Sequence, residues 1–147
     1  MVVDRRGELL PNRDRHRPRR AGRAGGVTDS LLRMSADCLF CKIIAGDVPS
    51  TEVYSDETVY AFRDIGPQAK AHVLVVPREH HEDAEALADH PELLAAVFKA
   101  GAQVARVEGI HESGFRFVFN TGDDACRTVF HAHLHVLGGE QLAGFGR

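Results

Sequence analysis

The stretch Val129-Phe130-His131-Ala132-His133-Leu134-His135-Val136-Leu137 places three histidines at every second position of an apolar run. Successive side chains of a strand point to opposite faces, so we expect a strand with the histidines on one face and Phe130, Ala132, Leu134 and Val136 on a core face. The histidine face has three explanations. It could be an ordinary polar surface, or a metal site, since alternating histidines suit metal ligands. The chemistry of imidazole near neutral pH favours the third, catalysis on a substrate.

Other motifs accompany this stretch along the chain. In chain order they are Cys38-Leu-Phe-Cys-Lys-Ile-Ile-Ala-Gly-Asp-Val-Pro49, Ala61-Phe-Arg-Asp-Ile-Gly-Pro-Gln-Ala69, His72-Val-Leu-Val-Val-Pro-Arg-Glu-His80 and Phe117-Val-Phe-Asn120. With them, the segment Phe130–Val136 resembles the histidine triad signature of the HIT superfamily of nucleotide hydrolases and transferases. The resemblance runs from about Asp37 to the C-terminus, and Leu137-Gly-Gly-Glu-Gln is similar to the Hint branch rather than the Fhit branch.

Length and charge predict one domain preceded by a basic tail. A chain of 147 residues suits a single domain. Residues 1–33 contain nine arginines and four acidic residues, whereas the remainder contains nine basic and seventeen acidic residues. High charge with little apolar periodicity predicts disorder, so we expect a disordered Arg-rich tail over residues 1–34 and a HIT domain over 35–147. The alternatives for the tail are a nucleic-acid-binding arm, a transit peptide, or an early start-codon assignment upstream of Met34.

Cysteine usage and hydropathy predict a cytoplasmic protein. Three cysteines, of which two form a Cys-x-x-Cys pair, fit a reducing compartment better than a disulfide framework. No stretch approaches the ~18–20 apolar residues of a membrane span. The sequence has no P-loop, glycine-rich dinucleotide fingerprint or DNA-binding motif, which argues against a kinase, an NAD enzyme or a nucleic-acid partner.

Local patterns predict mixed helices and strands. Asp37 can cap a short helix over about 38–45, and Pro91–Glu108 has the clearest helical spacing, ended by Gly109. The other expected elements are a hairpin of strands 51–56 and 58–63, a buried strand 72–76, a short helix 82–88, a strand 115–120 and the triad strand. Strands joined by short turns, with helices grouped separately, predict an α+β fold with a mostly antiparallel sheet. The resemblance implies the same fold, with about five strands and two main helices per subunit, paired as a homodimer.

The triad spacing predicts covalent catalysis. On one strand face the outer histidines lie about 7 Å from the middle one, close enough to bracket a phosphate that the middle imidazole attacks. This geometry favours His133 as the nucleophile, and the resemblance implies the same role. It also implies that His135 donates to a phosphate oxygen or the bridging atom, and that Thr128 and Asn120 contact the phosphate or the leaving group. His131 completes the predicted catalytic set.

The resemblance also implies a nucleotide-binding set. Asp64 and Ile65 match the pair that holds the nucleoside, and a carboxylate can accept both ribose hydroxyls. Phe40, Ile43 and Phe62 match an apolar slot for the base, although from the residues alone they are equally core residues. The remaining members of the predicted set are Asn120, Arg127, Thr128, His133 and His135.

One loop departs from the family pattern. This chain carries Cys126-Arg127 where many relatives have Gly-Gln or a similar pair. Glycine lets backbone amides approach a phosphate closely, so Cys126 is expected to tighten the loop or make activity sensitive to thiol reagents. Two alternatives stay open for Arg127, a phosphate contact or a position in solvent.

The Cys-x-x-Cys pair predicts a structural metal site. A thioredoxin-like redox pair requires a following helix in a βαβ setting, which this segment lacks. Resemblance to bacterial relatives implies structural zinc on four ligands, Cys38, Cys41, His80 and His131. His72 and His81 are alternatives for the first of the two histidines, and two reduced thiols without metal are the alternative to the site itself. No catalytic cofactor is expected.

The motifs together imply a Hint-type hydrolase. It would release a purine nucleoside 5′-monophosphate, AMP or GMP, from a phosphoramidate or a related nucleotide conjugate. The alternatives are a non-catalytic nucleotide-binding or adaptor protein and a dinucleoside polyphosphate hydrolase, the latter disfavoured by Gly138-Gly139. The intact triad with Asn120 and Thr128 favours the enzyme, since a pure binding protein need not keep them.

Overall fold

The computed structural model describes residues 37–145 of the chain, so the tail predicted over residues 1–34 lies outside the described residues. The elements follow one another as α2 (Leu39–Ala45), β1 (Glu52–Ser55), β2 (Val59–Arg63), β3 (Ala71–Pro77), α3 (Ala84–Ala88), α4 (Pro91–Val107), β4 (Phe115–Val118), η1 (Asp123–Ala125) and β5 (Leu134–Gly138). This confirms the predicted α+β class.

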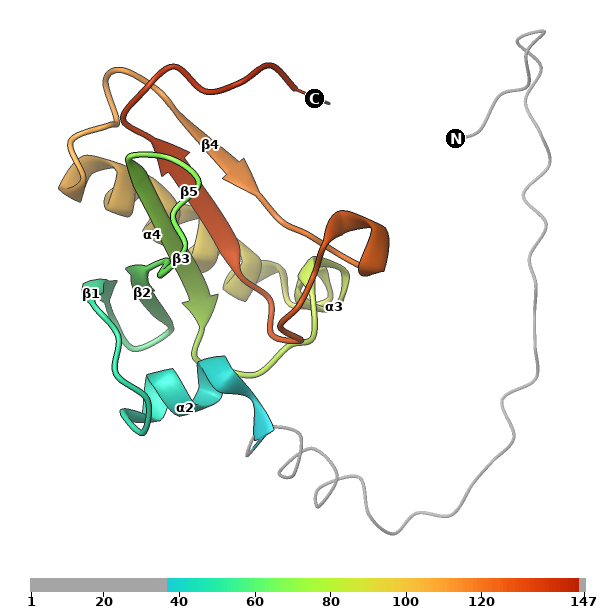
Figure 1. The fold of residues 1–147 in the computed structure, drawn as a ribbon. Helices are drawn as coiled ribbons and strands as arrows, with labels where there is room; N and C mark the ends of the chain where they lie inside the picture. The colour runs from blue at the N-terminus through green and yellow to red at the C-terminus, as the bar shows by residue number, and fades with distance from the viewer. Residues whose placement is uncertain (1–36, 146–147) are drawn as a thin grey trace, which may run out of the picture.

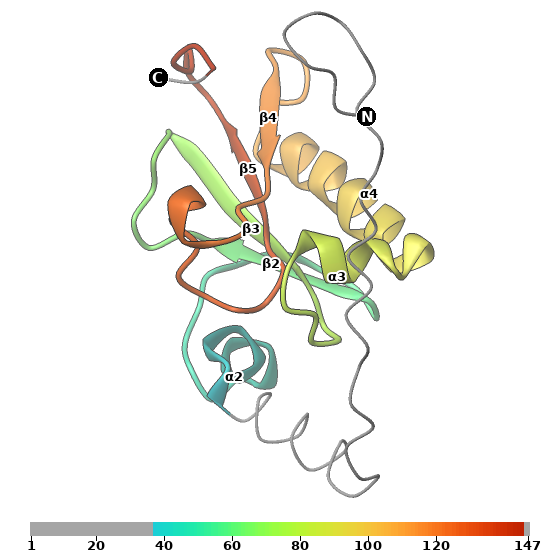
Figure 2. The same ribbon diagram turned by 90° about the vertical axis from the view of Figure 1, so that its right-hand side faces the viewer.

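The five strands form one sheet in the order β1-β2-β3-β5-β4, and every neighbouring pair is antiparallel. The predicted mostly antiparallel sheet of about five strands is therefore confirmed. Helix α4 packs along one face of the sheet, and α2 lies on the other side of β2 and β3 (Figures 1 and 2). No helix among residues 37–145 is long and apolar enough to span a membrane.

Strand β3 divides the core between these two helices. All seven of its residues are buried, and alternate side chains point to opposite faces. Val73 and Val75 belong to the cluster beneath α4, whereas Leu74 and Val76 pack with the residues of α2. A short strand that is buried on both faces reads as a continuous apolar run, as it does here.

Helix α4 begins at Pro91, as its spacing predicts, and ends at Val107, before the left-handed Gly109. Its buried face includes Gly101, where an added Cβ would lie 2.8 Å from Phe117 and 2.9 Å from Leu134. Helix α4 therefore approaches the sheet so closely at this point that a larger residue would displace the side chains of Phe117 and Leu134.

The N-terminal cap of α2 differs from the prediction. Cys38, rather than Asp37, is the cap residue, and its sulfur accepts from the backbone N–H of Cys41 at 3.5 Å. Asp37 was predicted as the cap because aspartate is a preferred N-cap residue, but the helix begins at Leu39, one residue later than expected. This shift places both sulfurs on the first turn of the helix.

The prediction of one strand carrying all three histidines was wrong in its extent. β5 begins at Leu134, so His131 and His133 precede it. The backbone N–H of Ala132 donates to the carbonyl of His81 at 2.7 Å, outside the sheet. Ala132, like Leu134 and Val136 after it, is nevertheless buried, as the alternation predicts.

The predicted position of Phe130 on the core face is also wrong. Its side chain is 51% exposed, and the Arg127 guanidinium lies 4.3 Å from the centre of its ring. The alternation of burial holds only from Ala132 onward, because His131 and Ala132 are both buried and residue 130 still belongs to the preceding loop.

Candidate active site

A cavity of about 350 Å³ lies between α2, the ends of β2 and β3, and the segment leading into β5. It brings together nine of the ten residues predicted to bind nucleotide, from four separate parts of the chain. These are Phe40, Ile43, Phe62, Asp64, Ile65, Asn120, Thr128, His133 and His135. A mainly apolar cavity with a few convergent polar groups is typical of small-molecule sites.

The apolar end of the cavity is built by α2 and β2. Phe40 and Phe62 are each 5% exposed, and their rings meet edge to face with centroids 5.5 Å apart. Ile43 is one turn further along α2 and is also buried. Ile65, in contrast, is fully exposed at the rim, where it is available to a bound molecule.

The His133 ring is anchored through Nδ1 to the backbone, which leaves Nε2 free of that contact. Its Nδ1 lies 2.7 Å from the carbonyl oxygen of His131, and a carbonyl can only accept, so Nδ1 carries the proton. The lone pair of a neutral imidazole is then on Nε2. Burial lowers the pKa of His133, against the opposing effects of the His131 carbonyl and Asp64. The geometry therefore favours the neutral, nucleophilic form.

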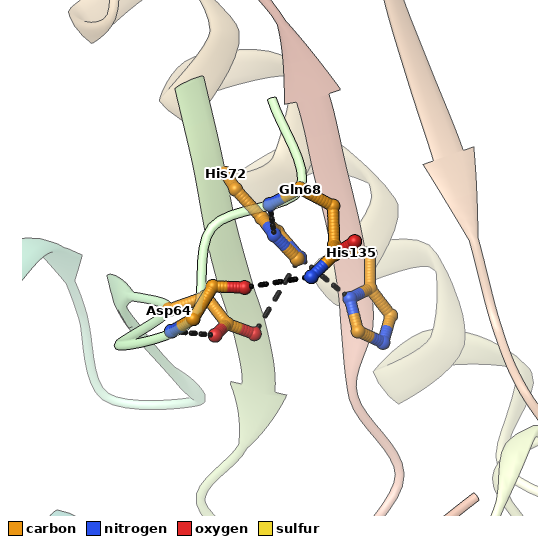
Figure 3. Close-up of polar contacts among 5 residues, drawn as sticks. Asp64, Gln68, His72 and His135 are labelled. Atoms are coloured by element: carbon orange, nitrogen blue, oxygen red, sulfur yellow. Dashed lines mark hydrogen bonds and ion pairs between the residues drawn. The ribbon is translucent and has the colours of Figure 1, made fainter. Parts of the chain in front are cut away.

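His135 is oriented by a chain of hydrogen bonds through His72 (Figure 3). The backbone N–H of Gln68 donates to Nδ1 of His72 at 3.0 Å, so the proton of a neutral His72 is on Nε2. That nitrogen lies 2.8 Å from Nδ1 of His135 and donates to it. His135 must then carry its own proton on Nε2.

This Nε2–H of His135 is buried and has no hydrogen-bond partner among the described residues. Burial, together with the neighbouring His133 and His72, lowers the pKa of His135 to about 4. The ring is therefore neutral at pH 7. A buried donor without a protein partner on the cavity wall is suited to an oxygen atom of a ligand.

Asp64 links the same cluster to the loop after β2 (Figure 3). One carboxylate oxygen accepts from the backbone N–H of Gly66 at 2.7 Å, and the other lies 3.5 Å from Nε2 of His72. The second oxygen retains acceptor capacity toward the cavity.

Asn120 and Thr128 flank a loop with two left-handed positions. Gly122 has φ of 83° and Cys126 has φ of 60°, at the two ends of η1. A positive φ is uncommon for residues other than glycine, which explains the glycine expected from the family pattern at position 126. The Cys126 side chain lines the cavity beside Thr128.

Arg127, the tenth predicted nucleotide-binding residue, does not line this cavity. Its guanidinium is 3.2 Å from a carboxylate oxygen of Asp83 and 3.6 Å from one of Glu82, and it stacks on Phe130. Its side chain is only 10% exposed. The side chain thus occupies a protein-lined position instead of pointing into solvent.

His131 belongs to a second cluster, separate from the cavity lining. The structure gathers possible metal-binding atoms from three segments, with all of them within 4.8 Å of one another: Cys38, Cys41, His80 and His131. The sulfur of Cys41 lies 3.4 Å from Nδ1 of His80 and 3.5 Å from Nδ1 of His131, and the two nitrogens are 3.2 Å apart.

These distances fit a tetrahedral zinc site. Zn–S bonds of about 2.3 Å and Zn–N bonds of about 2.0 Å, at tetrahedral angles, place sulfur and nitrogen about 3.5 Å apart and two nitrogens about 3.3 Å apart. His131 Nε2 lies 2.8 Å from the carbonyl of Pro77 and donates to it, which leaves Nδ1 unprotonated toward the sulfurs. Such an outer hydrogen bond typically orients a metal-binding histidine.

Burial keeps both histidines of this cluster neutral. It lowers the pKa of His131 to about 4 and also lowers that of His80. The other two candidate ligands lie elsewhere, since His72 contacts His135 and His81 packs against His90 with the two rings tilted and their centroids 4.5 Å apart. The donor set is therefore the one that the resemblance implies.

Sequence reasoning missed the roles of His72 and Gln68 beside His135. His72, eight positions before His80, was considered only as an alternative metal ligand. The pairing of Leu74 with His135 across β3 and β5 brings His72 to this site. No local pattern in the sequence indicates that register.

Comparisons with known proteins agree with this arrangement. The HIT domain family model matches residues 45–142. A purine nucleoside phosphoramidase from Escherichia coli (strain K12) is 39% identical over 110 residues, covering 74% of this chain and 92% of that protein. A 14 kDa zinc-binding protein from Zea mays is 44% identical over 107 residues, covering 71% of this chain and 83% of that protein.

A solved structure shows the same fold. The HIT family hydrolase from Clostridium thermocellum has a TM-score of 0.72 and 41% sequence identity, covering 76% of this chain and 97% of its own. The family model spans the triad and the cavity residues from Phe62 onward, and begins after the cysteine pair. The chain therefore belongs to the HIT domain family.

Proposed function

We propose that this protein hydrolyses purine nucleoside phosphoramidates or related nucleotide conjugates and releases the nucleoside 5′-monophosphate. The observation that carries the proposal is the arrangement of His133, whose Nδ1 proton is fixed by the His131 carbonyl while its ring lines the cavity. The phosphoramidase relative from Escherichia coli supports this substrate class.

In the first step, Nε2 of His133 attacks the phosphorus atom and the bond from phosphorus to the leaving group breaks. The leaving amine departs with the electron pair of that bond and takes up a proton from water. The Nε2–H of His135, which has no partner among the described residues, donates to a phosphate oxygen as negative charge develops. In the second step, water attacks the nucleotidyl-His133 intermediate, releasing the monophosphate and restoring the imidazole.

The other cavity residues bind the substrate. Phe40 and Phe62 hold the base by apolar contact, with few polar groups to distinguish one purine from another. Thr128 and Asn120 contact the phosphate or the leaving group from the loop side. Binding thus depends on the sugar and phosphate more than on the base.

A direct test is mass spectrometry of the protein mixed with adenosine 5′-phosphoramidate. Release of AMP, together with an adenylated peptide containing the triad, is the expected result. Binding of AMP without turnover of this compound would instead favour a nucleotide-binding module. Turnover of a dinucleoside polyphosphate in preference to the phosphoramidate would show that the protein is a dinucleoside polyphosphate hydrolase instead.

Asp64 is expected to bind the ribose. Asp64→Asn should weaken binding of AMP by about 10- to 100-fold, and binding of 2′-deoxy-AMP much less, since a hydrogen bond to a charged acceptor contributes roughly 1.5–3 kcal/mol. Titration calorimetry with both nucleotides measures the difference. An equal loss for the two sugars would mean that the contacts of Asp64 with Gly66 and His72 are its main role.

The same cavity is supported by a proposed structural zinc ion. Cys38, Cys41, His80 and His131 would hold it, and its chemistry there is to fix four ligands in a tetrahedron. The zinc-binding relative from Zea mays supports this choice of metal. The site would secure His131, whose carbonyl orients His133.

We also propose that the chain forms a homodimer through α4 and β4. Strand β4 is at one edge of the sheet, and Phe98 of α4 is 40% exposed beside Phe117 and Phe119, with ring centroids 5.5 Å and 6.0 Å away. An aromatic surface next to an unpaired strand edge favours association.

The dimer proposal predicts that Phe98→Glu gives a monomer. A charge placed in an apolar interface loses its hydration without gaining a partner, so the dimer should dissociate at micromolar concentration. Light scattering coupled to gel filtration measures the mass. Lys99→Glu, on the exposed side of the same helix, is the matched control and should leave the dimer intact. A monomeric wild-type protein would contradict the proposal.

A further inference from the structure

The loop of residues 121–130 borders the cavity but contributes no residue to the buried core. Its two backbone bonds, from Cys126 N–H to the Asp123 carbonyl at 2.9 Å and from Arg127 N–H to the Gly122 carbonyl at 3.3 Å, stay within the loop. Among the side chains of the loop, Val129 packs against the apolar cluster beneath α2. Arg127 makes the ionic contacts that leave it.

These contacts reach the start of α3. Nη1 of Arg127 is 3.2 Å from Oδ2 of Asp83, while Oδ1 of the same carboxylate caps α3 by accepting from the Ala86 N–H at 2.9 Å. Nη2 is 3.6 Å from Glu82, and the guanidinium plane covers Phe130 at 4.3 Å. We call this set of contacts the Arg127 clamp.

The clamp is well placed to fix Thr128. Further along the chain, the Ala132 N–H donates to the His81 carbonyl at 2.7 Å, which ties the triad segment to the same 77–83 region. Thr128 lies between these two attachments and lines the cavity. Without the clamp, residues 127–131 would be anchored only at their C-terminal end, and the backbone that carries Thr128 would be less constrained.

We propose that Arg127 is a positioning residue that acts through Thr128 and the loop backbone. This inference rests on the proposed function, because it assigns the loop to the phosphate and leaving group. Both terminal nitrogens of the guanidinium face carboxylates, its buried Nε has no hydrogen-bond partner among the described residues, and the side chain does not line the cavity. Its effect should therefore appear in the chemical step rather than in nucleotide affinity.

The test compares Arg127→Met with Arg78→Met. Methionine keeps the length and apolar contact of the arginine stem and removes its charge. Arg78 is a matched control because it also makes one hydrogen bond, to the Asp56 carbonyl at 2.7 Å, and lies over a ring, that of Tyr60, at 5.7 Å. The two variants should lose similar stability, measured as Tm.

For Arg127→Met, kcat with adenosine 5′-phosphoramidate should fall about 10- to 100-fold while KM changes less than about threefold, as expected for a small misplacement of reacting groups. Amide hydrogen exchange over residues 122–130 should become faster, with β3 and α4 unchanged. Asp83→Asn keeps the helix cap, since Asn caps as well as Asp, and should lower kcat in the same direction. Combining the two changes should add little further loss.

Three results would overturn the clamp. One is a rise in KM at constant kcat, which would make Arg127 a direct phosphate ligand. Another is an equal fall in kcat for Arg78→Met, which would reduce the effect to stability. The third is unchanged exchange in the loop of Arg127→Met. If wild-type protein released no AMP, the proposed function would fail. Amide hydrogen exchange over residues 122–130 would then be the measurement that tests whether Arg127 holds the loop.

Discussion

Replacing His133 with alanine should abolish phosphoramidate turnover while AMP still binds with nearly wild-type affinity. The imidazole forms the covalent bond, and loss of a covalent catalyst costs at least about 10⁴-fold in kcat, far more than one hydrogen bond at ~1 kcal/mol. The nucleotide is held mainly by groups that the substitution leaves in place, namely Asp64 and the apolar end of the cavity lined by Phe40 and Phe62. Single-turnover kinetics and AMP titration measure the two effects separately.

His111→Ala is the matched control, because this histidine is partly exposed and lies outside the cavity. It should retain wild-type turnover. In the wild-type protein, acid quenching during turnover should trap adenylate on the peptide containing residue 133, and the alanine variant should show none. Substantial activity in His133→Ala, or an adduct on another residue, would end the covalent mechanism.

The fold could be predicted largely because its periodic segments are buried on one or both faces. The run from His72 to Pro77 is uniformly apolar after its histidine, and β3 is buried throughout. The helical spacing after Pro91 predicted α4 to within one residue. Both patterns arise from burial in the hydrophobic core, so the periodicity of the sequence matches the elements observed.

The cavity could be predicted only through the resemblance. Phe40 and Phe62 look like ordinary core residues, and each is in fact packed in the cluster beneath α2 as well as lining the cavity. Burial and binding use the same side chains here, so no hydrophobic pattern separates the two roles. The matching family motifs supplied that distinction.

The parts that sequence reasoning missed depend on pairing between distant segments. His72 lies near the start of β3 and His80 lies just after its end, so most of the length of an extended strand, at about 3.3 Å per residue, separates them. They therefore serve different clusters, although they are close in sequence. Arg127 pairs with Asp83, 44 positions away, and no local pattern at either residue indicates this contact.

The start of β5 was mispredicted for a related reason. An alternating apolar segment can pair in a sheet or simply extend between other anchors. Here Ala132 bonds to His81, and Nε2 of His131 bonds to the Pro77 carbonyl, so this segment follows the loop after β3 rather than the sheet. The two anchors place His131 toward the cysteines and leave His133 facing the cavity.

Removing the metal should destabilise this whole region. The four proposed zinc ligands come from the start of α2, the loop after β3 and the triad segment. In the sequence, His80 lies 39 positions and His131 lies 90 positions after Cys41. A metal present at about a thousandfold above its Kd stabilises a fold by about 4 kcal/mol. For a domain of this size, loss of the metal should lower Tm by roughly 15 °C or more.

Elemental analysis of protein purified without chelator should accordingly find about one zinc per chain. Cys38→Ser should lose the metal and the thermal stability, with a smaller effect on AMP affinity, because Cys38 does not line the cavity. Cys126→Ser, which changes a cysteine outside the cluster, is the matched control and should keep both. Zinc should dissociate as the pH falls, since thiolates must be deprotonated to bind it. Metal-free protein of full stability would show that the cysteines pack against the histidines without a metal, and that the hydrogen bond from His131 to Pro77 is enough to orient the catalytic segment.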